Sequence, residues 1–139
     1  MMSIIDAISI RLNETFGDDY TIYLESVEQN LQTPCFFIQP LASMGHEMID
    51  YRSYRSHSFM IDFIPSDELG HRAQFAEVTD KLFDSFESLT LDDGIILPTF
   101  NRRVDVTDDV LHFIVEFKFY GRKEKPEEDA LETMNMTVI

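Results

Sequence analysis

The side chains in this sequence that could carry out chemistry are its four histidines, its single cysteine and its acidic residues. The histidines are His46, His57, His71 and His112, and no two of them stand three or four residues apart. That spacing would place two metal ligands on one face of a helix, and the sequence has no pair of cysteines, the other common zinc ligands. We therefore expect no metal site.

Other kinds of catalytic site find little support. Cys35 could be a nucleophile, but it lies in the apolar run Cys35–Ile38, where a thiol is usually buried and unreactive. The five glycines are isolated, so we expect no phosphate-binding loop and no cofactor. Adjacent acids fall in predicted turns or linkers, at 18–19, 92–93, 108–109 and 127–128. A glycosidase-like carboxylate pair stays open, but no motif selects one, and we predict that the protein is not an enzyme.

The charge of the chain restricts its partners. Its 139 residues include 11 Lys and Arg against 26 Asp and Glu, a formal net charge of −15 at pH 7. Affinity for phosphates and for anionic lipids comes mostly from basic side chains, so we expect no direct DNA binding and no membrane association. Residues 1–50 contain one basic residue, Arg11, and eight acidic ones. This acidic first third predicts either ordinary solubility or a surface that repels DNA or faces a basic partner.

The compartment can also be predicted. A single cysteine allows no intrachain disulfide, which fits a reducing cytoplasm. The N-terminus lacks the basic and then apolar segments of a secretory signal, and no apolar run approaches the roughly 18 residues that cross a bilayer. We expect a soluble intracellular protein.

The first half of the chain predicts one helix and three strands. Ser3 is a typical capping residue, and an apolar stripe at helical spacing follows it as far as Gly17. Strands are predicted where apolar residues are dense or alternate, over residues 21–27, 35–38 and 51–64. Pro40 limits the second of these strands, and segment 42–50 breaks the pattern, which predicts a loop with apolar tips.

The second half predicts a helix followed by a hairpin. Ser66 is a capping candidate, and an apolar stripe from Phe75 to Leu89 gives the buried face of the helix. Two long strands follow, and their short connection predicts an antiparallel hairpin of residues 95–106 and 110–120. In the last strand His112 belongs to the set that faces away from the core, as a surface or interface histidine.

Together these elements predict an α+β domain over residues 1–121. The sheet would have about five strands, mostly antiparallel, with two helices packed on one face, in the order α-β-β-β-α-β-β plus a tail. Residues 122–139 would form a charged linker and a partly apolar C-terminal tail. A lone domain has little use for such a tail, so we expect it to dock on something.

Several strings of residues, taken in order, resemble a known family. They are 22–29 leading into 34–38, the stretch containing Tyr51, Arg52, Tyr54 and Arg55, the string 59–65, and the string 109–113. In this order, from about Ile4 to Phe119, they resemble the small tail-terminator-like proteins of long-tailed phages and of prophage elements in Gram-positive bacteria. The sequence has Asn30 and Asp109 where the pattern would have glycine, and Asn also tolerates a left-handed turn.

The resemblance implies a structural role without catalysis. Proteins of this kind assemble as a ring, usually a hexamer, on the head-proximal end of the tail tube, where they stop polymerisation and enable head joining. The implied partners are further copies of the chain, the tail tube protein and a head–tail connector protein. DNA would only pass through the lumen without binding. The implied locations are the virion tail and, during assembly, the host cytoplasm.

Ring formation suggests which residues meet. The candidates for subunit contacts are the basic residues and the methionines of the loop and tail, namely Arg52, Arg55, Arg102, Arg103, Met44, Met48, Met134 and Met136. The arginines could face the acidic first third of a neighbouring copy, a head-to-tail contact that makes rings. The candidates for a lumen or acidic surface are Glu25, Glu28, Glu47 and Asp50.

Two other functions stay open. A small chain with a net charge of −15 could mimic DNA and inhibit a DNA-binding protein, although much of the acid lies in turns rather than along one surface. The chain could also be another small tail-completion or head–tail connector protein.

Overall fold

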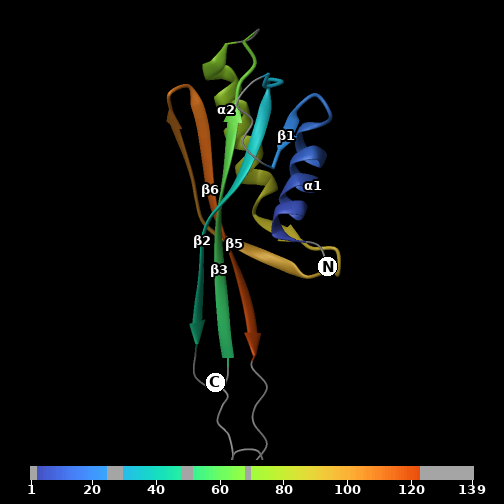
Figure 1. Ribbon diagram of the computed structural model, residues 1–139, viewed down its shortest axis with the longest axis vertical. Coiled ribbons are helices and arrows are strands. Elements are labelled where there is room, and N and C mark those ends of the chain that lie inside the picture. Colours follow the sequence, from blue (N-terminus) through green and yellow to red (C-terminus); the bar gives the residue numbers. More distant parts are fainter. Residues whose placement is uncertain (1–2, 25–29, 48–51, 68–69, 123–139) are drawn as a thin grey trace, which may run out of the picture.

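The computed structural model of the chain describes residues 3–24, 30–47, 52–67 and 70–122. Its elements, in chain order, are α1 (Ile4–Phe16), β1 (Thr21–Tyr23), β2 (Cys35–Glu47), β3 (Arg52–Ile64), α2 (His71–Ser85), β4 (Ser88–Thr90), β5 (Ile96–Thr107) and β6 (Val110–Arg122). They form a curled six-stranded sheet in the order β1-β2-β3-β6-β5-β4, in which only β1 and β2 pair in parallel (Figure 1). The predicted α+β class and mostly antiparallel sheet are confirmed, with six strands rather than about five.

Helix α1 begins and ends where the sequence predicts. The hydroxyl of Ser3 accepts a hydrogen bond from the backbone N–H of Asp6 at 3.1 Å, which satisfies one of the free donors of the first turn. Gly17 ends the helix with φ of 90°, a conformation that favours glycine. Ile8 and Leu12 of its apolar stripe are fully buried.

Strand β2 is much longer than predicted. It runs through Pro40 and continues to Glu47, so the predicted loop is wrong for residues 42–47, while 48–50 lie outside the described residues. The physical reason is its place at the side of the sheet. Beyond Phe37 no described strand pairs with the outer side of β2, and a bulge at Leu41 absorbs the irregularity next to the proline.

The second helix is shorter than predicted. It begins at His71 rather than near Ser66, because the side-chain amide of Gln74 bonds both the N–H and the carbonyl of Ser66 at 2.9 Å and holds that residue in front of the helix. The helix ends at Ser85, so Leu89 lies in the unpredicted strand β4 and not on the helix. Leu89 is buried all the same, because it is the inward-facing residue of β4, next to the exposed Thr90.

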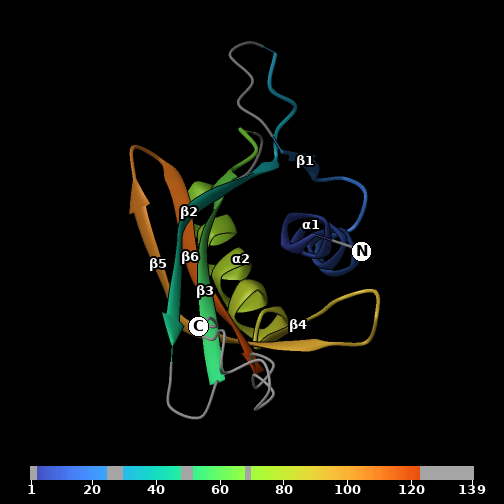
Figure 2. The same ribbon diagram turned by 60° about the horizontal axis from the view of Figure 1, so that its bottom comes forward.

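The β5–β6 hairpin is confirmed. Thr107 pairs with Val110 across a two-residue turn, Asp108-Asp109, whose φ angles are 52° and 63°. Two positive φ values are those of a type I′ turn, whose twist matches that of the flanking strands. A bulge between Phe100 and Arg103 interrupts the register of β5 with β6, and the other end of β5 runs to β4 (Figure 2).

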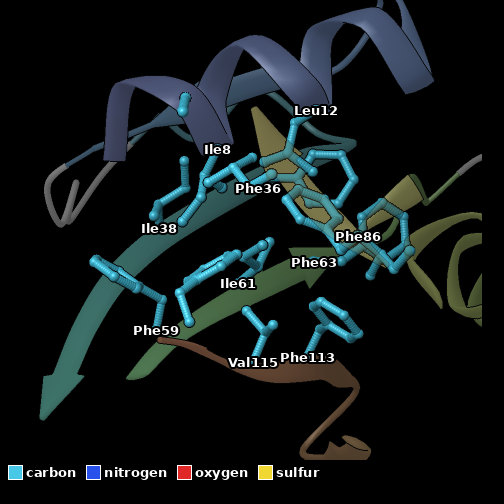
Figure 3. Packing of buried hydrophobic residues seen from close by; sticks show 14 of the residues in the cluster. Ile8, Leu12, Phe36, Ile38, Phe59, Ile61, Phe63, Phe86, Phe113 and Val115 are labelled. Atoms are coloured by element: carbon cyan, nitrogen blue, oxygen red, sulfur yellow. The ribbon is translucent and has the colours of Figure 1, made fainter. Parts of the chain in front are cut away.

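The core lies between the two helices and one face of the sheet. Side chains alternate along β2, β3 and β6, and the inward set packs under α1 and α2 (Figure 3): Phe36, Ile38, Phe59, Ile61, Phe63, Leu111, Phe113, Val115 and Phe117. Five phenylalanines are fully buried within it. The sequence has no tryptophan, and phenylalanine side chains are the large groups that fill the core.

Arg11, the one basic residue of the first 50, serves this packing. Its guanidinium donates hydrogen bonds to the carbonyls of Ser85 and Ser88, the latter at 2.9 Å, and so fastens α1 to the end of α2 and the start of β4. Figure 2 shows α1 beside the β4–β5 hairpin, which curls around it.

The helices cover only part of the sheet. In Figure 1, β2, β3 and β6 continue well past the ends of both helices and form a three-stranded projection. Glu47, Ser53 and Gly121 lie in one row across its end. We call residues 42–47, 52–58 and 117–122 the sheet projection.

Candidate interaction surfaces

The side chains that could do chemistry do not gather into one site. His57 bonds the hydroxyl of Ser43 at 2.8 Å, and His71 and His112 bond the carboxylates of Asp109 and Asp62 at 2.5 and 2.6 Å. His46 is in β2, but its side chain is not described. Within the described ranges no group of three or more His, Cys, Asp or Glu side chains could hold a metal ion.

The helix-free face of the sheet holds one buried polar cluster. Asp62 on β3 is 9% exposed, and its two oxygens are bonded by His112 on β6 and by the amide of Gln39 on β2 at 2.9 Å. His112 therefore faces away from the helices as the alternation predicts. With both oxygens of Asp62 bonded, the cluster ties β2, β3 and β6 together.

Cys35 is fully buried at the start of β2, and burial raises the pKa of its thiol to about 11. Because burial disfavours the charged form, only about one thiol in a thousand is ionised at pH 8, and the thiolate is the reactive species. We expect iodoacetamide at pH 8 to leave Cys35 of the native chain unmodified over hours, and to modify it within minutes in 6 M guanidinium (about the concentration that unfolds most domains). Mass spectrometry measures both, and equal rates would contradict the buried position of Cys35.

The structure separates the predicted basic residues. Arg55 and Arg103 are both exposed, but Arg55 lies opposite Phe119 on the helix side of the sheet and Arg103 lies opposite Ile114 on the helix-free side. Arg102 is used within the chain: it donates to the carbonyl of Phe83 at 2.8 Å and stands 5.7 Å from the centre of the Phe83 ring. Arg52 is the first residue of β3 and lies in the sheet projection, and its side chain is not described.

The other predicted contact residues are only partly placed. Met44 lies on β2 and is 54% exposed. Glu47 is the last residue of β2, and its side chain is not described. The remaining candidates lie outside the described residues: Met48, Met134, Met136, Glu25, Glu28 and Asp50.

Sequence reasoning missed the two open sides of the sheet. β1 pairs only with residues 35–37 of β2, and β4 pairs only with residues 96–98 of β5. Among the described residues, nothing pairs with the outer side of β2 over 38–47 or of β5 over 99–107. Such rows of free backbone donors and acceptors are templates for another strand. We call them the β2 edge and the β5 edge.

Fold and surfaces together define a class of protein before any comparison. Among the described residues, this small α+β domain presents two different open sheet edges, and such edges are surfaces for assembly with further strands. The comparison with protein families agrees, because the model of a family described as phage tail terminator protein matches residues 3–129. The chain belongs to this family, and it is a structural, non-enzymatic component of the phage tail that interacts with the tail tube. A search of curated proteins gave no match.

Proposed function

We propose that copies of this chain close into a ring, a hexamer as the family resemblance implies, on the head-proximal end of the tail tube. There the ring stops tube growth and presents the surface to which a head–tail connector protein binds. Membership of the tail terminator family carries this proposal.

The two open edges support a ring. They belong to different strands at opposite sides of the sheet order, so a contact between the β2 edge of one copy and the β5 edge of the next joins unlike surfaces. Such head-to-tail contacts repeat from copy to copy and close into a ring when the rotation between copies allows it. Backbone pairing between edges would extend the sheet from one subunit into the next.

The charge supports passage of DNA through that ring. A net charge of −15 per subunit repels phosphates, so DNA would not bind to an acidic lumen as it moves. The acids predicted to line it are Glu25, Glu28, Glu47 and Asp50.

The arginines provide a test with a built-in comparison. Arg103→Glu should weaken ring formation about tenfold and leave the melting temperature unchanged, because the side chain is exposed and close to the β5 edge. Arg102→Glu should instead destabilise the fold by roughly 1–3 kcal/mol, because it leaves the carbonyl of Phe83 without its donor. Light scattering and thermal melts measure the two effects. Unchanged rings in Arg103→Glu would remove this residue from the interface.

Electron microscopy tests the function itself. Negatively stained tail tubes mixed with the full chain should carry a ring at one end, and the tubes should stop growing there. Protein that leaves both tube ends bare would contradict the proposal.

A further inference from the structure

The β2 edge lacks the usual protection of an open strand. No charged residue occurs from Cys35 to Gly45, and all residues from 39 to 45 are exposed. Leu41 and Met44 present large apolar side chains there, at 49% and 54% exposure. Proteins normally place charges, above all lysine, on a strand edge that stays open. Pro40 and the bulge guard one end of this edge and Glu47 stands at the other, but residues 42–45 carry neither a charge nor a proline.

The β5 edge is different. It carries Arg102, Arg103 and Asp105, and the bulge after Phe100 breaks its regular backbone spacing. These are the features that discourage unwanted pairing. Of the two edges, the β2 edge is therefore the one that needs a cover in the free protein.

The last seven residues of the chain have the pattern of a strand. Residues 133–139 read Thr-Met-Asn-Met-Thr-Val-Ile, without a charge and with Met134, Met136 and Val138 alternating with polar residues up to 137. Alternation with β-branched residues is typical of a strand. This segment lies beyond residue 129, where the match to the family model ends, so the family match does not cover it.

The described chain ends close to the β2 edge. Gly121 on β6 pairs with Ser53 on β3, and Ser53 pairs with Glu47 on β2. A strand added outside β2 would lie about 15 Å from β6, at three strand spacings. Residues 123–132 can span up to about 33 Å. A segment that turns back here runs opposite to β2, and antiparallel strands need only a short connection.

We propose that residues 133–139 pair with residues 42–47 of their own chain as an antiparallel strand at the β2 edge. The tether favours the chain's own tail over that of a second copy, because it sets an effective concentration in the millimolar range. The added strand satisfies the free backbone groups of β2 and covers Met44. It also keeps the β2 edge from neighbouring copies until the tail is displaced on the tube, a consequence that rests on the proposed ring.

Hydrogen exchange of the full chain tests the pairing directly. In peptides covering residues 42–47, exchange should be about tenfold slower in the full chain than in a chain lacking residues 130–139. Peptides from the β5 edge, residues 99–107, should exchange equally in both and show that the fold is intact. Met136→Pro, which removes a strand donor, should behave like the deletion, while Glu128→Pro in the connection should retain the protection.

Two results would overturn the pairing of the tail with the β2 edge, and a third would support it independently of the ring proposal. Equal exchange over 42–47 with and without the tail would overturn it. Protection that disappears on dilution to nanomolar protein would also overturn it, because a second copy would then supply the strand. Protection that persists on dilution supports it, even if tail tubes stay uncapped and the ring proposal fails. If the tail pairs with the β2 edge and the chain also forms rings, the chain without residues 130–139 should self-associate about tenfold more tightly in the absence of tubes.

Discussion

Phe113→Ala is expected to lower the free energy of unfolding by about 3–5 kcal/mol, the range for a buried ring truncated in a packed core. Phe113 is fully buried near the start of β6, and its ring lies 5.6 Å from that of Phe83 and 5.9 Å from that of Phe86. The change therefore removes the packing of β6 against Phe83 of α2 and against Phe86 just after the helix. For a domain of this size the melting temperature should fall by roughly 10–20 °C.

Phe63→Ala should have an effect of the same size in the part of the core where β2 and β3 meet α2. Phe63 is fully buried on β3 and packs 5.2 Å from Phe36 and 6.3 Å from Phe75. Phe37→Ala is the matched control, because Phe37 is only partly buried and its ring stacks on Tyr23 alone among the described rings, at 5.0 Å. Thermal melts of the three variants decide the point. Wild-type melting temperatures for Phe113→Ala and Phe63→Ala would contradict the placement of these two side chains in the core.

Lysine at both Leu41 and Met44 is expected to weaken ring formation on tail tubes by roughly 100-fold, since each apolar side chain buried in an interface contributes about 1–2 kcal/mol. Both residues are half-exposed on the β2 edge, so the fold should be unaffected. New lysines keep a strand edge hydrated and repel a second strand.

The control for that experiment uses apolar residues of equal exposure elsewhere. Ile10 on α1 and Ile95 before β5 are 47% and 45% exposed, and neither lies on the β2 edge. Ile10→Lys with Ile95→Lys should leave ring formation at the wild-type level. Light scattering and microscopy report the comparison. A stronger effect from this pair than from Leu41 and Met44 would move the interface to the α1 side.

Local sequence patterns predicted the elements that depend on neighbouring residues, such as helix ends and tight turns. The hydroxyl of Ser3 caps the start of α1 and Gly17 ends the helix with a positive φ, and the Asp108-Asp109 turn follows from the chemistry of a two-residue hairpin. Strand β2 could not be predicted in full, because Pro40 and Gly45 usually interrupt strands and are tolerated here only where no described strand pairs with the outer side. Which side is open depends on pairing between distant segments, and no local pattern contains it.

The surface was harder to predict than the fold for a similar reason. Arg102 and Arg103 are neighbours in sequence, yet a bulge turns Arg102 to the carbonyl of Phe83 and leaves Arg103 exposed on the helix-free side. Arg11 could be counted as a charge but serves as a fastening between α1 and the end of α2. A residue type shows what a side chain can bind, and only the packing shows what it does bind.

Our central proposal is that this protein caps a tail tube as a ring. It is supported by the opposed, unlike edges of the sheet and by the family of the chain. Electron microscopy of tail tubes incubated with the full chain measures this most directly. We predict ring-shaped density with a central hole at one end of each tube and none along its sides. Protein bound along the tube walls, or rings that never contact a tube end, would contradict the claim.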